Sequence, residues 1–174
     1  MTISDFADRE KTAMAMRVTA AALVLLSTSC QPAQQQRLTV EEVTAIADSV
    51  GVLFDQIPQA VNALEIDRLL GYYREAENLT YLAGGRITRS HEAFAAIMDG
   101  QFRSAAEADL RWLERYVDVL GRDVAIASAT FEFTMVLQRG DTARSSGTYM
   151  AAYVRRDGEW KIEHTGHTFP AGAQ

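Results

Sequence analysis

The chain has 174 residues, of which 48% are hydrophobic and 23% charged, with a formal net charge of −6. These values are typical of a globular protein with one hydrophobic core, and they exclude a largely disordered chain. An acidic surface repels phosphate backbones, and no run of Lys or Arg forms a basic stripe, so we expect no nucleic-acid partner.

The first 29 residues have the pattern of an export signal. Arg17 precedes an apolar run, residues 18–26, and small residues at 27–29 lead to Cys30, the only cysteine. The run is too short to cross a bilayer, which takes about 20 apolar residues. The pattern resembles the bacterial lipoprotein box, although Ser27 stands where that pattern prefers Leu. The resemblance implies a lipidated Cys30 and a protein anchored in the cell envelope, facing the periplasm or the cell exterior.

Two alternatives stay open for this region: a simple cleaved signal, or a buried helix over residues 16–29. Three acidic residues near Met1 are unusual in a leader, and a start at Met14 or Met16 would remove them. We expect residues 1–29 as the signal segment, 30–37 as the lipidated cysteine and a flexible tether, and 38–174 as one folded domain. A single cysteine excludes an intrachain disulfide and a cysteine-based zinc site within one chain.

Helical patterns fill the first part of the domain. Apolar residues recur every three or four positions over residues 40–64, and Thr39 has capping-box spacing, which predicts one long amphipathic helix. A short helix is expected over residues 67–73, and a third over residues 90–102. Between them, Gly84 is flanked by two strand-like stretches and predicts a tight hairpin.

From residue 105 onward the pattern changes from helical to alternating, which predicts long strands. Turn residues at Gly121, Gly140 and 157–158 divide this region. In residues 124–138 the odd positions are apolar and most even positions are polar, so one face of this strand is expected to be buried. Helices followed by antiparallel strands predict an α+β fold with the helices on one face of a curved sheet.

Three stretches carry a family resemblance: residues 61–67 with the tyrosines that follow, residues 119–125, and residues 156–162. In their order and spacing they resemble the nuclear transport factor 2-like superfamily, in particular its SnoaL-like and ketosteroid-isomerase-like branches. The resemblance implies a cone-shaped curved antiparallel sheet packed against three N-terminal helices. This superfamily includes isomerases, dehydratases, hydrolases and binding modules without catalysis, so the resemblance leaves the activity open.

Ketosteroid-isomerase chemistry is not expected. The resemblance would require a tyrosine and two aspartates at positions where this chain carries Ile57, Leu82 and Ala151. All three chemical groups are missing.

A two-residue turn at residues 157–158 predicts which residues of the last two strands face one another. The predicted pairs are Arg155 with Trp160, Tyr153 with Ile162, Ala151 with His164 and Tyr149 with Gly166. This register puts His164 on the apolar inner face, where a histidine can act as general acid or base, with Tyr149 or Tyr153 as hydrogen-bond donor. The alternative is a neutral core histidine bonded to a tyrosine hydroxyl.

Aromatic side chains on the expected inner face predict a lining for an apolar ligand, with plain core packing as the alternative. The candidates are Tyr72, Tyr81, Trp112, Phe131, Phe133, Tyr149 and Tyr153, with Tyr73 beside Tyr72. We therefore expect a small apolar ligand or a dimeric scaffold without turnover. The alternative is an isomerase, dehydratase or hydrolase that uses His164 as general base.

No cofactor or metal is predicted. His91 and His167 lie in different contexts, so no three-ligand metal set is indicated, and Gly84 and Gly85 precede a strand pattern where a phosphate loop would precede a helix. The opposite sheet face is expected to be polar and to form a homodimer, with a solvated monomer surface as the alternative. Its predicted residues are Ser128, Thr130, Glu132, Thr134, Lys161, Glu163, Thr165 and His167.

Overall fold

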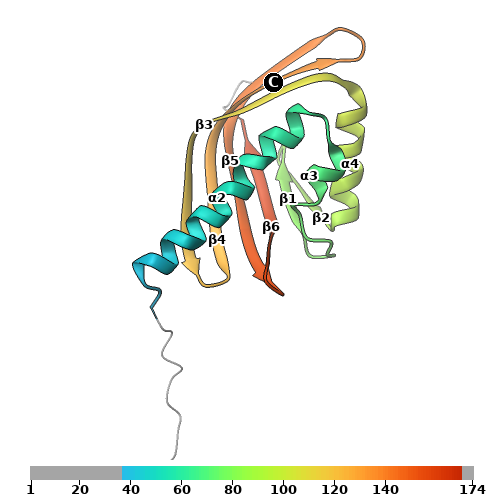
Figure 1. Ribbon diagram of the computed structural model, residues 1–174. Coiled ribbons are helices and arrows are strands. Elements are labelled where there is room, and N and C mark those ends of the chain that lie inside the picture. Colours follow the sequence, from blue (N-terminus) through green and yellow to red (C-terminus); the bar gives the residue numbers. More distant parts are fainter. Residues whose placement is uncertain (1–36, 170–174) are drawn as a thin grey trace, which may run out of the picture. The chain divides into compact units, whose positions relative to one another are not determined.

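The structure, a computed structural model, describes residues 37–169. The predicted signal segment, Cys30 and most of the predicted tether lie outside the described residues. Of these, residues 38–169 form one compact unit. Its elements in chain order are α2 (Val40–Asn62), α3 (Ile66–Leu70), β1 (Thr80–Ala83), β2 (Arg86–Arg89), α4 (His91–Ser104), β3 (Ala105–Gly121), β4 (Val124–Leu137), β5 (Thr142–Arg156) and β6 (Glu159–Thr168) (Figure 1).

The long helix α2 begins as the sequence predicts. The Thr39 hydroxyl accepts a hydrogen bond from the Glu42 amide at 3.2 Å, and the Glu42 carboxylate accepts one from the Thr39 amide at 2.8 Å. These two bonds satisfy amides at the helix start that have no partner within the helix. The helix ends at Asn62, two residues before the predicted end, because Leu64 has a positive φ of 55°.

The two shorter helices differ in how well they were predicted. α3 is shorter than expected because residues 71–73 leave the helix, and Tyr73 forms a parallel bridge with Ile162 of β6. α4 begins after Ser90 as predicted, and the Ser90 hydroxyl accepts a hydrogen bond from the amide of Ala93 at 3.2 Å.

All six strands form one curved sheet in the order β2-β1-β6-β5-β4-β3. The predicted α+β fold and the turn positions are confirmed, and both two-residue turns, 84–85 and 157–158, have positive φ at each residue. Neighbouring strands are antiparallel except β1 and β6, which are parallel, so the expectation of a purely antiparallel sheet is wrong at that pair. The parallel pair forms because the early β1–β2 hairpin adds to the free side of the last strand.

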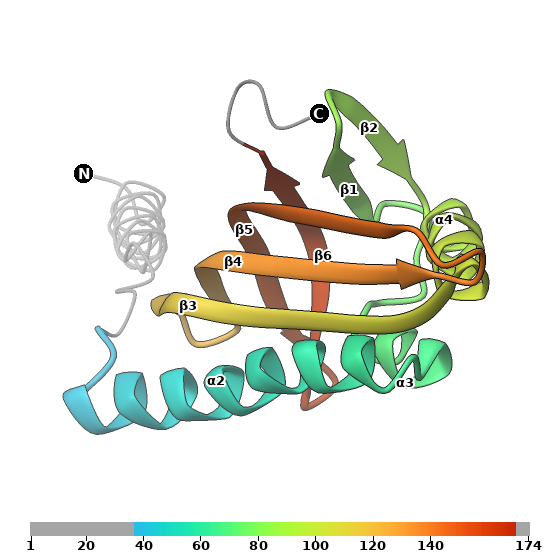
Figure 2. The same ribbon diagram turned by 90° about the horizontal axis from the view of Figure 1, so that it is seen from above.

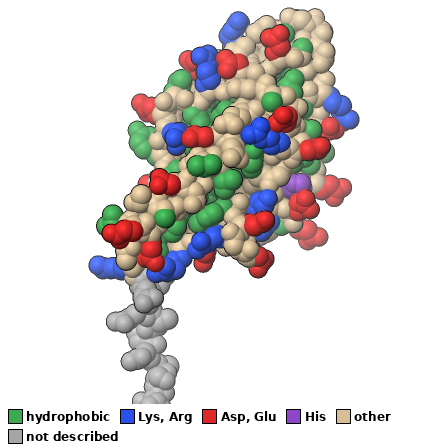
Figure 3. Space-filling view, viewed as in Figure 1, with side chains coloured by type: hydrophobic (Ala, Val, Ile, Leu, Met, Phe, Trp, Pro, Cys, Tyr) green, Lys and Arg blue, Asp and Glu red, His purple; other side chains and the backbone are tan. Residues whose placement is uncertain are grey.

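One face of the sheet, here called the inner face, packs against α2. Figure 2 shows α2 running alongside β3, with α3 and α4 gathered at one end of the sheet. Small residues on β4 and β5, Ala125, Ala127 and Ala151, let the helix approach closely, and all three are fully buried. The opposite side is called the outer face. On the side of the domain that carries α2, acidic and basic side chains are interspersed (Figure 3).

The edge strand β3 is covered at one point by a side chain of α2. The Asn62 amide group donates to the carbonyl oxygen of Leu110 at 3.1 Å and accepts from the Leu110 amide at 2.6 Å. Asn62 therefore makes the two hydrogen bonds that a further strand would make at this position.

Candidate functional site

A cavity of about 340 Å³ lies between the helices and the inner face. Most of its lining is apolar and comes from the three helices, the turn between α2 and α3, β3 and β4: Ile57, Val61, Leu64, Leu69, Phe94, Met98, Phe102, Leu110, Trp112, Phe131, Phe133 and Met135. A few polar residues interrupt it: Tyr73, Tyr81, Gln101, Arg144, Ser145, Tyr149 and His167. Gln101 and Arg144 are exposed, so the mouth lies between the end of α4 and the β4–β5 hairpin.

The structure brings five of the seven predicted ligand-binding residues to this cavity. They are Tyr81, Trp112, Phe131, Phe133 and Tyr149. Trp112 stacks on Phe54 of α2 with ring centroids 4.9 Å apart, and it also contacts Tyr149 at 5.2 Å. Because these rings support one another, the Trp112 face of the cavity is a preformed wall.

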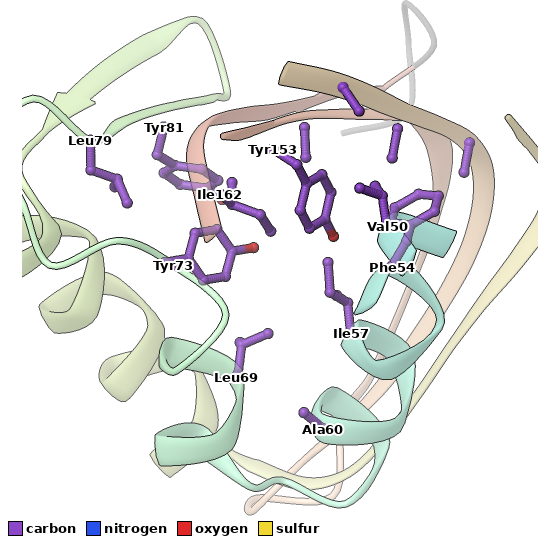
Figure 4. Close-up of a cluster of buried hydrophobic side chains, with 14 of the residues drawn as sticks. Val50, Phe54, Ile57, Ala60, Leu69, Tyr73, Leu79, Tyr81, Tyr153 and Ile162 are labelled. Carbon is purple, nitrogen blue, oxygen red and sulfur yellow. The ribbon is translucent and has the colours of Figure 1, made fainter. Parts of the chain in front are cut away.

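Tyr72 and Tyr153 do not line the cavity. The Tyr72 hydroxyl accepts a hydrogen bond from Arg68 Nε at 2.9 Å, and the adjacent Tyr73 enters the cavity in its place. Tyr153 is fully buried at the part of the sheet where α2 packs directly onto it. Figure 4 shows its ring next to Val50, Phe54 and Ile57, which fill the space that a ligand would need.

The prediction that His164 lies on the inner face is wrong. The predicted pairs at the turn hold, since Arg155 faces Trp160 and Tyr153 faces Ile162. Glu163 is then an extra residue, a β-bulge, and His164 faces Ala152 instead of Ala151. His164 is therefore exposed and absent from the cavity lining, which removes it as a candidate base in this cavity.

The same bulge turns two residues inward that were expected on the outer face. Thr165 faces Ala151 and is buried, and His167 faces Tyr149 and lines the cavity. The inward positions of Thr165 and His167 follow from the extra residue in β6. The alternation of polar and apolar residues in the sequence gives no clear signal of that bulge. The outward positions on β4, from Ser128 to Thr134, are as predicted.

The bulge residue Glu163 is itself buried and held by two arginines. Arg156 donates to both carboxylate oxygens at 2.7 and 2.9 Å, and Arg74 Nε lies 2.7 Å from Oε1. Hydrogen bonds from Arg156, with the further charge of Arg74, lower the pKa of the Glu163 carboxyl below its usual value. The carboxylate is thus charged and paired, and it fixes the register that brings His167 into the cavity.

His167 is the only histidine of the described residues that lines the cavity. Its ring lies among aromatic rings, 5.7 Å from Tyr81, 6.2 Å from Phe131 and 5.0 Å from Phe169 between centroids. Burial lowers the pKa of His167 below its usual 6.5. The imidazole is therefore neutral near pH 7 and has a free nitrogen lone pair that can accept a proton.

Two tyrosine hydroxyls form the main polar point of the cavity. The hydroxyls of Tyr73 and Tyr149 lie 3.2 Å apart. Burial raises the pKa of both groups, and it raises the pKa of nearby Tyr81 to about 12. All three hydroxyls are therefore protonated at neutral pH and act as hydrogen-bond donors.

Phe169 reaches the cavity because β5 carries a glycine beneath it. A Cβ at Gly147 would lie 1.9 Å from the carbonyl oxygen of Thr168. Only glycine leaves room for the end of β6 to cross this position. Phe169 then packs edge-on against Phe131, with centroids 6.1 Å apart.

Apart from Arg144 at its mouth, the cavity offers neutral hydrogen-bond donors and one neutral base, His167. Among the described residues, the lining contains no Asp or Glu, and no group of three or more potential ligand side chains is placed to hold a metal ion. No helix within residues 37–169 is long and apolar enough to cross a membrane. The arrangement can hold an apolar molecule and bond to one of its polar atoms.

Solved structures with similar folds come from several bacteria. An NTF2-like superfamily protein from Salmonella enterica is 13% identical in sequence, with a TM-score of 0.67. The match covers 75% of this chain and 95% of the Salmonella protein. The hexachlorocyclohexane dehydrochlorinase LinA-type3 from Novosphingobium barchaimii shares 13% with a TM-score of 0.64, covering 77% and 96%. An NTF2-like protein of unknown function from Pseudomonas putida shares 17% with a TM-score of 0.63, covering 73% and 88%.

Curated proteins provide no match to this sequence. The sequence profile of the SnoaL-like domain family matches residues 50–172, which include the elements that build the cavity from the middle of α2 to Phe169. The similar structures independently confirm the predicted fold class. The chain therefore belongs to the SnoaL-like domain family and has the nuclear transport factor 2-like fold.

Proposed function

We propose that the domain binds a small, largely apolar molecule in the cavity and holds one oxygen atom of that molecule with the hydroxyls of Tyr73 and Tyr149. The observation that carries this proposal is the hydroxyl pair, 3.2 Å apart, in a cavity whose lining is otherwise mostly apolar. Its volume of about 340 Å³ is at the lower end of the range for small-molecule pockets.

The hydroxyl donors of Tyr73 and Tyr149 indicate which chemical group a ligand would place next to them. Tyr73 and Tyr149 share one hydrogen bond, and Thr165 is a further hydrogen-bond partner of Tyr149. A ligand oxygen would accept the second tyrosine proton in place of Thr165. The raised pKa values keep both protons in place at neutral pH. A ketone or similar uncharged oxygen acceptor fits this site, because both hydroxyls are neutral donors in a mostly apolar lining.

A matched pair of probes tests the oxygen contact. We expect 2-acetylnaphthalene to bind more tightly than 2-ethylnaphthalene, which has the same rings and no carbonyl. In Tyr149→Phe or Tyr73→Phe this preference should shrink by about fivefold to tenfold, while the affinity for the ethyl compound stays unchanged. Tyr116→Phe, which changes an exposed tyrosine outside the cavity, is the control. Equal affinities for both probes in the unchanged protein would contradict the oxygen contact.

Native mass spectrometry of protein purified from the source cell tests occupancy directly. A ligand that copurifies and is lost on denaturation supports the binding proposal. Protein that carries no ligand, and binds neither naphthalene probe at millimolar concentration, would count against a binding function altogether.

A second candidate is proton transfer, and the position of His167 favours it. A neutral imidazole lies on the same wall as the hydroxyl of Tyr149, so one group can accept a proton from a bound substrate while the other donates a hydrogen bond to it. One structure of similar fold is named a dehydrochlorinase. A substrate screen should find an activity that His167→Gln lowers by about 10² to 10⁴. The exposed His164→Gln is the control, and equal effects of both variants would exclude His167 as the base.

We also propose that the chain is exported and anchored by a lipid on Cys30. The run of residues 18–26 and the small residues before Cys30 support this. Cys30→Ser should abolish membrane association in detergent partitioning without changing the thermal unfolding of the domain, whose buried core residues lie between Ile46 and Ile162. Unchanged protein found entirely in the aqueous phase would refute lipidation.

A further inference from the structure

The mouth of the cavity is polar on both sides, unlike its interior. Gln101 of α4 lies on one side, and Arg144 and Ser145 of β5 lie on the other. Gln101 follows Phe94 and Met98 at helical spacing, so it lies on the same helix face as these two buried residues. Among residues 37–169, the side chains of Gln101, Arg144 and Ser145 have no hydrogen-bond or ion-pair partner.

Gln138 holds the two sides of the mouth together. Its backbone amide donates to the carbonyl oxygen of Ser104 at 2.9 Å, and its side-chain amide donates to the carbonyl oxygen of Ala105 at 2.8 Å. These bonds join the β4–β5 hairpin to the end of α4, and Figure 2 shows the ends of β4 and β5 next to that helix. The polar residues of the mouth are therefore in place before a ligand enters, which lowers the entropic cost of binding.

The strand β5 has a free edge at this point. β6 ends opposite Thr148, so within the described part of the chain residues 142–147 pair with β4 alone. A free edge presents backbone amides that have no partner. Arg144 lies on this stretch and is exposed, and because no strand covers the edge its side chain can turn around it toward the mouth. The mouth thus combines free amide donors with a cation.

The charge of the lining favours an anion at the mouth. Arg144 is the only charged side chain of the lining as the structure describes it, and no carboxylate opposes it. Guanidinium and amide groups are strong donors to a carboxylate. A phosphate would bring nearly two negative charges to this one cation, so a carboxylate, which brings one, is the better match.

We propose that the ligand of the cavity is an apolar acid whose carboxylate lies at the mouth, bound by Arg144 with Gln101 and Ser145 as further hydrogen-bond donors. The inference rests on the proposed binding function and names the class of ligand. Tyr73 and Tyr149 hold an oxygen at the inner end, and the carboxylate stays close to solvent at the outer end.

The two polar ends also set the length of the ligand. Ser145 and Tyr149 are four residues apart on β5, so they lie on the same face about 13 Å from one another along the strand. Phe131 and Phe133 pair with Gly147 and Ser145, which makes the wall between the two ends aromatic. A body of two fused rings with one substituent at each end suits this wall.

A matched pair of probes without a ketone tests the carboxylate, so the outcome does not depend on the tyrosine contact. The full chain is used, in a Cys30→Ser background so that no lipid takes up the probes. By naphthalene fluorescence, 6-ethyl-2-naphthoate should bind at least about tenfold more tightly than 2-ethylnaphthalene. Arg144→Gln should remove this gain, and Arg144→Lys should keep it to within about threefold. Arg86→Gln, which removes the same charge from an exposed position outside the lining, is the control.

A second measurement locates the carboxylate. Tyr149→Phe should leave the gain from the carboxylate unchanged, because the two ends lie about 13 Å apart. The probe 6-acetyl-2-naphthoate, which carries both polar groups, should bind more tightly than 2-acetylnaphthalene and more tightly than 6-ethyl-2-naphthoate. Circular dichroism should show the variants folded, because Arg144 is exposed and Tyr149→Phe keeps the ring.

Each other outcome overturns the proposal. An acid that binds no more tightly than 2-ethylnaphthalene would show that the mouth has no anion site. A gain that Arg144→Gln and Arg86→Gln lower equally would come from the overall charge of the chain. A gain lost in Tyr149→Phe and kept in Arg144→Gln would place the carboxylate at the inner end. In all three cases 2-acetylnaphthalene can still bind, which leaves the proposed function standing, whereas both proposals fall if no probe binds.

Discussion

The indole nitrogen of Trp112 donates a hydrogen bond to the backbone carbonyl oxygen of Phe54, 3.2 Å away. In an uninterrupted helix this carbonyl would accept from the amide four residues later, but that residue is Pro58, which has no amide hydrogen. The proline therefore frees a carbonyl inside α2, and Trp112 on β3 satisfies it. The bond joins helix and sheet at the wall of the cavity.

Trp112→Phe should lower the free energy of unfolding by about 1 to 3 kcal/mol more than the lost ring area explains, because the Phe54 carbonyl loses its partner. In a Pro58→Ala background the extra cost should disappear, since the new amide at position 58 supplies the missing donor. Urea unfolding of the four proteins measures this coupling. Equal costs of Trp112→Phe in both backgrounds would show that the bond contributes nothing.

The pKa of His167 should be measurably low. Because burial disfavours the imidazolium form, the unfolded chain takes up a proton first as the pH falls through 6.5. The contribution of the neutral His167 to the free energy of unfolding is therefore fully present above pH 6.5. It decreases as the pH falls from 6.5 to the lowered pKa of the folded state. NMR titration of the histidine ring protons, with His167→Gln to assign the signal, should give a midpoint below 6.5. A midpoint at or above 6.5 contradicts a buried neutral imidazole.

Glu163→Gln should destabilise the domain by about 3 kcal/mol at pH 7, because it leaves the arginine pair without its carboxylate. The lowered pKa of Glu163 means that its contribution is present above the usual carboxyl value of 4.5 and is lost as the pH falls through the lowered pKa. The difference between the two proteins should therefore shrink in acid. Glu132→Gln, which breaks an exposed pair with Arg111, should cost less than about 1 kcal/mol.

Gly147→Ala should destabilise the domain by about 1 to 3 kcal/mol and move Phe169 out of the cavity, because the backbone of Thr168 has to shift. Gly100→Ala is a matched control within α4, where an added Cβ meets no atom within 4 Å. That change should stabilise the helix by about 0.5 to 1 kcal/mol. Thermal unfolding compares the two variants, and equal melting temperatures would contradict the close approach at Gly147.

The local elements were predictable because each depends on neighbouring residues. The capping box at Thr39, the alternation of residues 124–138 and the two positive-φ turns all act within a few positions. The hairpin register was predicted correctly from the turn as far as the pair of Tyr153 with Ile162. The strand register failed one residue later, at Glu163, because the bulge depends on Arg74, which is far away in the sequence.

The candidate site was therefore predicted in part. Aromatic residues on strands with regular alternation, such as Phe131 and Phe133, were placed correctly. His164 was placed on the wrong face and His167 was missed as a cavity residue, since one extra residue reverses every side chain beyond it. Tyr73 enters the cavity because its backbone pairs with Ile162, a parallel contact between distant segments that local patterns do not report.

The contact between Asn62 and Leu110 bears on how copies of this chain can associate. An exposed strand edge can recruit a strand from another molecule, and that addition can repeat without end, as in fibrils. At Leu110 a side chain of the same molecule already occupies both backbone groups of the edge strand. The same two hydrogen bonds that join α2 to β3 therefore prevent strand addition at this point of the edge.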